Sequence, residues 1–151
     1  GGLGGYCAAS RNVVQYLRLY ARSYFFSTAL PASVAGGLNE VFKLLASDNA
    51  GREKLWENIN YLKQKLSEKG FDIGNSQSAV IPVMIYSEPV LFELYDKLRR
   101  NGVYVNIVTY PAVRRKECRM RLCAMKDLNF EQIERAVDII AKYAREYNVI
   151  S

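Results

Sequence analysis

The stretch CRMRLCAM, residues 118–125, alternates apolar and polar side chains. Successive side chains of a β-strand point to opposite faces of its sheet, so this alternation predicts a strand that is buried on one face only. The expected buried face carries Cys118, Met120 and Leu122, and the other face carries Arg119, Arg121 and Cys123. The fold then depends on which segments pair with this strand and which cover its apolar face.

Two other segments predict strands. SAVIPVMIY, residues 78–86, is rich in valine and isoleucine, and Pro82 inside it favours a sheet edge or a bulge because proline cannot donate a ladder hydrogen bond. VYVNIVTYP, residues 103–111, alternates as a half-buried strand does, with Val103, Val105 and Ile107 on one face and Tyr104, Asn106 and Val108 on the other.

Apolar residues at helical spacing predict five helices, whose ends are indicated by capping residues. Asn129, with Gln132 three positions later, forms a capping-box pattern, and Ser87 can cap another helix. Gly70 and Gly102 stand where two helices should end. The predicted ranges are 11–22, 31–47, 52–69, 88–101 and 129–147.

From residue 79 onward the predicted order is strand, helix, strand, strand, helix. This order is typical of an α+β fold, in which a small antiparallel or mixed sheet is backed by helices. A chain of 151 residues is long enough for one domain with a core of its own, or for one domain with a small appendage.

The composition argues against several kinds of site. The three cysteines lack CxxC spacing and the chain has no histidine, so zinc sites, disulfide frameworks and Ser-His or Cys-His nucleophiles are disfavoured. A reducing compartment fits this cysteine usage, and we therefore expect a cytoplasmic protein. No apolar run approaches the ~20 residues that span a bilayer.

The net charge of +6 comes largely from Arg99, Arg100 and the stretch 113–121. A solvated basic edge, a phosphate or carboxylate site and a nucleic-acid surface are all compatible with it. No zinc-finger, RRM or KH signature accompanies the charge, which disfavours nucleic acid.

Two places combine polar groups with apolar surroundings. In FFSTALP, residues 25–31, the adjacent hydroxyls of Ser27 and Thr28 could wrap an anion, or could instead satisfy the local backbone and cap the helix at Pro31. Arg121 lies on the polar face of the predicted strand, where a guanidinium suits bidentate binding of a carboxylate. An exposed strand arginine without a ligand is the commoner case.

Three segments in succession resemble the C-terminal part of the α-oxoamine synthases: GGLGGY at residues 1–6, RSYFFSTALP at 22–31, and YPAV with CRMRL within 110–122. These are fold-type-I enzymes that use pyridoxal 5′-phosphate (PLP), among them 8-amino-7-oxononanoate synthase and glycine C-acetyltransferase. The resemblance implies the C-terminal domain of such a transferase. Residues 1–47 would be the tail of the large PLP domain with connecting helices, and residues 48–151 the small α+β domain.

The resemblance also implies roles for single residues. In this family a glycine loop follows the lysine that binds PLP covalently. We therefore expect that lysine before Gly1, no catalytic residue within these 151, and no activity of the chain alone. The implied cofactor-binding residues are Gly4 and Gly5, beside the PLP lysine, and Ser27 and Thr28, at the PLP phosphate of the neighbouring subunit. The implied substrate-binding residue is Arg121, which would hold the substrate carboxylate.

The substrates implied are a small amino acid and an acyl-CoA, bound by a homodimer without nucleic acid and without a membrane span. The family usually carries a small-residue AAH stretch after the arginine strand, whereas this chain reads CAMKDLN at 123–129. The identity of both substrates therefore stays open. From the residues alone, the alternatives are a non-catalytic basic α+β module that binds nucleic acid or an acidic partner, and a dimerisation domain without a site.

Overall fold

The computed structural model describes residues 2–151. The chain divides into two compact units, residues 1–49 and 50–151, each with its own secondary structure. This division lies two residues beyond the boundary that the resemblance implies. The assignment of the first unit to the tail of a larger domain stays a prediction.

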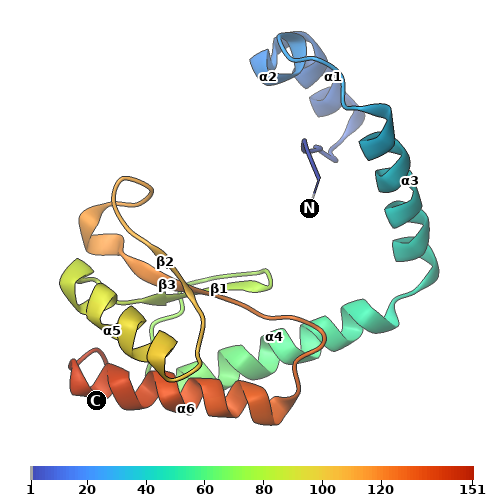
Figure 1. Ribbon diagram of the computed structural model, residues 1–151. Coiled ribbons are helices and arrows are strands. Elements are labelled where there is room, and N and C mark those ends of the chain that lie inside the picture. The colour runs from blue at the N-terminus through green and yellow to red at the C-terminus, as the bar shows by residue number, and fades with distance from the viewer. Residues whose placement is uncertain (1) are drawn as a thin grey trace. The chain divides into compact units, whose positions relative to one another are not determined.

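A three-stranded antiparallel sheet forms the centre of the second unit (Figure 1). Its strands are β1 (Val80–Met84), β2 (Asn106–Val108) and β3 (Arg119–Cys123), in the order β1-β3-β2. The alternating stretch is thus the central strand, and Pro82 lies in an edge strand, as predicted. β2 is shorter than predicted because the chain before it closes the preceding helix: the N–H of Val103 donates to Leu98 O at 3.0 Å.

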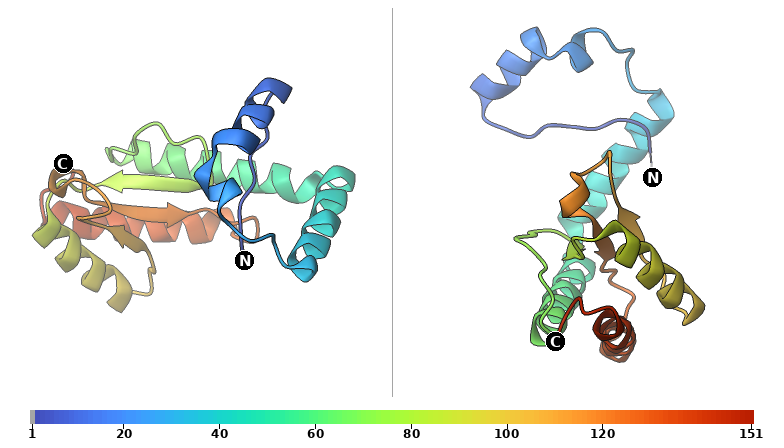
Figure 2. Two further views of the ribbon diagram at one scale, coloured as in Figure 1. Left: turned by 90° about the horizontal axis from the view of Figure 1, so that it is seen from above. Right: turned by 90° about the vertical axis from the view of Figure 1, so that its left-hand side faces the viewer.

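Three helices cover one face of this sheet, as Figures 1 and 2 show. They are α4 (Ala50–Glu68), α5 (Glu88–Arg100) and α6 (Phe130–Glu146), and α6 contacts both of the others. The α+β class predicted from the order of elements is therefore confirmed, with an antiparallel sheet.

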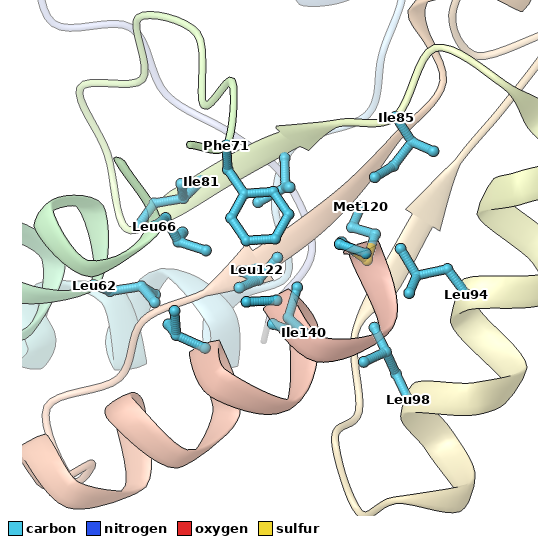
Figure 3. Close-up of a cluster of buried hydrophobic side chains, with 14 of the residues drawn as sticks. Leu62, Leu66, Phe71, Ile81, Ile85, Leu94, Leu98, Met120, Leu122 and Ile140 are labelled. Atoms are coloured by element: carbon cyan, nitrogen blue, oxygen red, sulfur yellow. The ribbon is translucent and has the colours of Figure 1, made fainter. Parts of the chain in front are cut away.

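The core lies between the sheet and these helices (Figure 3). Met120 and Leu122 of β3 are buried, while Arg121 between them is exposed, which confirms the predicted alternation. Burying a large apolar side chain contributes about 1.5–3 kcal/mol, so the helices remain on this face. The labelled core residues are Leu62, Leu66, Phe71, Ile81, Ile85, Leu94, Leu98, Met120, Leu122 and Ile140.

The predicted caps are present with one correction. Asn129 and Gln132 form the capping box in both directions, at 2.8 and 3.0 Å, and Gly70 adopts φ of 87° after α4. Ser87 occupies the N-cap position of α5, as predicted. Its side chain makes no hydrogen bond to the first turn of the helix, however, so the prediction that the hydroxyl caps α5 was wrong.

The first unit contains α1 (Arg11–Tyr20), α2 (Arg22–Phe25) and α3 (Ala32–Ser47). The predicted helix 11–22 is interrupted at Ala21, whose backbone is extended with ψ of 109°. None of its described residues, 2–49, is buried, and Phe26 is 82% exposed. Because folding needs buried apolar surface, this unit has no core of its own.

Candidate active site

The strand register and the burial pattern place eight side chains, in three cross-strand rows, on the face of the sheet turned away from the helices, and we call it the open face. Residues directly opposite each other in an antiparallel pair share a face, so the strand register defines these rows. None of the eight side chains is acidic. The rows are Val80 with Cys123, Pro82 with Arg121 and Asn106, and Met84 with Arg119 and Val108.

The two arginines of the open face differ in their partners. Arg119 donates from Nε to the carbonyl of Glu117 at 2.7 Å, and its Nη2 lies 3.8 Å from the Glu117 carboxylate. The side chain of Arg121 is exposed and makes no hydrogen bond or ion pair with any residue from 2 to 151. The positive charge of Arg121 is therefore available to a ligand, whereas that of Arg119 is already paired.

The position of Arg121 suits recognition of a carboxylate. It stands in the central strand, which is bonded to a neighbour on each side, so its backbone is held more firmly than that of an edge residue. A guanidinium presents paired N–H donors in a plane, which match the two oxygens of a carboxylate. The sequence prediction that Arg121 is a substrate-binding residue is consistent with this geometry and stays a prediction.

Ser27 and Thr28 lie between α2 and α3, and both are exposed. Neither hydroxyl is hydrogen-bonded to another residue of the described chain. The N-cap of α3 is Pro31, without a side-chain cap bond, so these hydroxyls do not cap that helix. The alternative that they serve only the local backbone thus has no support, and both groups are available to an anion.

Gly4 lies against the same segment. Its φ is 102°, a conformation that favours glycine, and a Cβ added there would overlap the side chain of Leu30. The structure therefore brings Gly4 close to the segment that carries Ser27 and Thr28. Gly5 has open space where a Cβ would stand and lines a hollow of about 680 Å³ together with residues of α1 and α2. Arg121 belongs to the other unit.

The structure adds a residue that the sequence analysis missed. Asn58 of α4 is completely buried, and its Nδ2 donates to the carbonyls of Met125 at 2.9 Å and Leu128 at 2.8 Å. This amide holds the CAMKDLN stretch, which directly follows β3, against α4. The sequence feature that could have identified Asn58 is its position: it is a polar residue on the apolar stripe of that helix, next to Ile59.

A second hollow, of about 300 Å³, lies where β1 ends, beside the loop after α4 and the C-terminal residues. Tyr86 in its wall has φ of 64°, which is unfavourable for a residue other than glycine. The Tyr86 hydroxyl donates to Asp72, and this hydrogen bond lowers the pKa of the Asp72 carboxyl. The N–H of Gly74 also donates to the Asp72 carboxylate, so this carboxylate stabilises the turn at residues 72–74.

Among residues 2–151, no group of three or more histidine, cysteine, aspartate or glutamate side chains is placed to hold a metal ion. Nor does any helix within that range have the length and apolar character needed to cross a bilayer.

The family model for class I and II aminotransferases matches residues 1–140. This chain belongs to that family. 8-Amino-7-oxononanoate synthase from Alkaliphilus metalliredigens is 35% identical over 150 residues, which cover 99% of this chain and 38% of that enzyme. Serine palmitoyltransferase from Sphingobacterium spiritivorum is 37% identical over 150 residues, covering 99% of this chain and 37% of that enzyme. The chain thus spans somewhat more than a third of these relatives' length.

Solved structures show the same fold. A serine palmitoyltransferase (SPT) with its PLP internal aldimine has a TM-score of 0.75 at 26% identity, covering 93% of this chain and 36% of its own. The Sphingomonas wittichii serine palmitoyltransferase has a TM-score of 0.74 at 30% identity, covering 100% of this chain and 38% of its own. The named relatives are α-oxoamine synthases, so the resemblance seen in the sequence is confirmed.

Proposed function

We propose that this chain is the C-terminal part of a PLP-dependent acyltransferase that condenses a small amino acid with an acyl-CoA, as in 8-amino-7-oxononanoate synthase or glycine C-acetyltransferase. The observation that carries the proposal is Arg121, an unpaired guanidinium on an open sheet face that has no acidic side chain. The similarity to two acyl-transferring enzymes over 99% of the chain favours this function over a basic binding module.

The residues present fit the cofactor. Adjacent hydroxyls and backbone N–H groups suit a phosphate, and Ser27 and Thr28 offer both without another partner in the described chain. Gly4, which has no Cβ, leaves room for the Leu30 side chain of the same segment. We propose that Ser27 and Thr28 hold the PLP phosphate of the neighbouring subunit and that Gly4 and Gly5 lie beside the lysine that binds PLP. When bound, PLP withdraws electrons from the α-carbon of the amino acid.

In this proposal the chain's own residues orient the substrate. The Arg121 guanidinium holds the amino-acid carboxylate and thereby fixes the direction of the α-carbon toward the cofactor. Fixing the reacting groups in this way removes orientational entropy from the reaction. The buried Asn58 amide holds in place the stretch that directly follows the strand of Arg121.

The test is release of the CoA thiol. The longer protein that contains this chain, supplied with PLP, an acyl-CoA and glycine, alanine or serine, should release thiol in proportion to turnover with one of the three. A protein that binds PLP but releases no thiol with any of them would contradict the proposed reaction.

The 151 residues alone should be inactive, because we place the PLP-binding lysine in the part of the enzyme outside this chain. Mixed with PLP and reduced with borohydride, the chain should show only weak labelling spread over several lysines. Peptide mapping by mass spectrometry measures this. One lysine labelled stoichiometrically, together with turnover, would refute the assignment.

We also propose that the longer protein is a homodimer in which Ser27 and Thr28 approach the partner's PLP phosphate. This proposal is supported by the exposed apolar side chains of the first unit, which a partner subunit could cover. Sedimentation equilibrium should therefore give twice the monomer mass. A fully active monomer would contradict this assembly.

A cytoplasmic location completes the proposal. It is supported by the cysteine usage: Cys7, Cys118 and Cys123 are all free, and an odd number of thiols is usual for a reducing compartment.

A further inference from the structure

Arg121 has a polar neighbour on the open face that the sequence analysis did not assign. Asn106 of β2 is the register partner of Arg121, and both side chains are exposed on the same face. Directly opposed residues have Cβ atoms about 4.5–5.5 Å apart. The other neighbour in this row, Pro82 of β1, offers no side-chain donor.

Asparagine is unusual at this position. It is depleted in strands, and its neighbours Val105, Ile107 and Val108 are all β-branched and partly buried. Like the side chain of Arg121, that of Asn106 makes no hydrogen bond or ion pair with another residue of the described chain. Neither sheet formation nor an internal contact therefore accounts for an amide here.

We propose that Asn106 is a second donor to the carboxylate that Arg121 holds. This inference rests on the proposed function for the identity of the ligand, a small amino acid. A carboxylate has two oxygens with about four lone-pair sites, of which a bidentate guanidinium uses two. One Asn106 N–H can take a further site from the adjacent strand. Because the two donors stand on different strands of one rigid sheet, together they restrict the carboxylate's rotation more than Arg121 alone.

The pairing also predicts selectivity. Asn106 donates without adding charge, so it strengthens binding of a carboxylate without attracting anions at long range. An aspartate at this position would have nearly the same shape but would place a negative charge beside the ligand, and like charges at this separation repel. The site should therefore tolerate loss of the amide far better than its conversion to an acid.

The experiment is a titration of the isotope-labelled 151-residue chain with sodium acetate, followed by NMR at constant ionic strength. The Arg121 Nε and Asn106 Nδ2 resonances should shift along one common binding curve. The Arg119 Nε resonance, whose group is already bonded to Glu117, should move little. Methylammonium, which has no carboxylate, should shift none of the three.

Variants make the test quantitative. Asn106→Ala should weaken acetate binding at Arg121 by roughly three- to tenfold, the net worth of one ordinary hydrogen bond at an exposed site. Asn106→Asp should weaken it further. Asn60→Ala, at an exposed position of α4, is the matched control and should leave binding unchanged. In the Arg121→Ala variant the Asn106 Nδ2 resonance should no longer shift with acetate, because the charge that holds the ligand beside it is gone.

The outcomes separate this inference from the proposed function. A shift at Arg121 without a shift at Asn106, or equal effects of Asn106→Ala and Asn60→Ala, overturns the role of Asn106 and leaves that of Arg121 standing. If acetate shifts neither the Arg121 nor the Asn106 resonance, the carboxylate site itself is overturned. If the Arg121 and Asn106 resonances both shift with acetate while the longer protein releases no CoA thiol, the joint carboxylate site stands and the proposed reaction fails.

Discussion

Replacing Arg121 by alanine in the proposed longer enzyme should weaken binding of its proposed amino-acid substrate by about 2–5 kcal/mol, roughly 30-fold or more in affinity. The reason is that this change removes a charge-assisted, bidentate pair for which no other side chain of the open face substitutes. PLP affinity should be nearly unchanged, since the residues we assign to its phosphate lie in the other unit. Titration of the cofactor's visible absorbance with amino acid measures both quantities.

Two further substitutions sharpen this prediction. Arg121→Lys should restore only part of the affinity, because an ammonium lacks the planar fork of a guanidinium. Arg119→Ala is the control on the same face. Arg119 stands two residues away along β3, about 6.6–6.8 Å, and is engaged by Glu117, so its loss should change affinity by no more than a few-fold. Equal losses at the two arginines would show that the carboxylate site is elsewhere.

Replacing Asn58 by leucine should destabilise the chain by about 2–4 kcal/mol in the free energy of unfolding. Leucine is similar in size but leaves the carbonyls of Met125 and Leu128 without the donor that now serves both. A buried carbonyl that loses its partner costs about 1–3 kcal/mol. The Leu128 carbonyl loses its Asn58 donor, whereas that of Met125 still accepts the N–H of Leu128 at 3.4 Å, which limits the sum. Urea denaturation monitored by circular dichroism measures the change.

The matched control for Asn58 is two residues along the same helix. Asn60→Leu changes the same side chain at an exposed position, so its effect should stay within about 0.5 kcal/mol. An Asn58→Leu variant that is as stable as this control would show that the amide does not hold the loop. A shared m value for both variants would indicate that the native states are equally compact.

Local patterns predicted most of the secondary structure, and their failures have local causes. The capping box at Asn129 and the glycine after α4 depend on residues within one turn of helix, so both were confirmed. β2 was predicted too long because alternation continues through Val103 and Val105, although the N–H of Val103 closes α5. A pattern of exposed and buried residues does not reveal which carbonyl an N–H will reach.

The candidate site was predicted less completely. Ser27, Thr28 and Arg121 were singled out because polar groups stood among apolar neighbours, but a single strand gives no reason to prefer Arg121 over Arg119. That preference rests partly on family resemblance and partly on the side-chain partner of Arg119 in the structure. Asn106 and Asn58 were not assigned roles, because their significance depends on residues far away along the chain.

The sequence by itself determined the α+β class, an alternating strand with one apolar face, and the capping box and glycine that bound two of the helices. These features follow from periodicity and from hydrogen bonds between near neighbours. Only the tertiary structure decided which arginine lacks a partner, which amide stands beside it, and which buried amide holds the stretch after β3. Strand register and packing place residues 15 to 70 positions apart in contact, and no local pattern encodes those pairings.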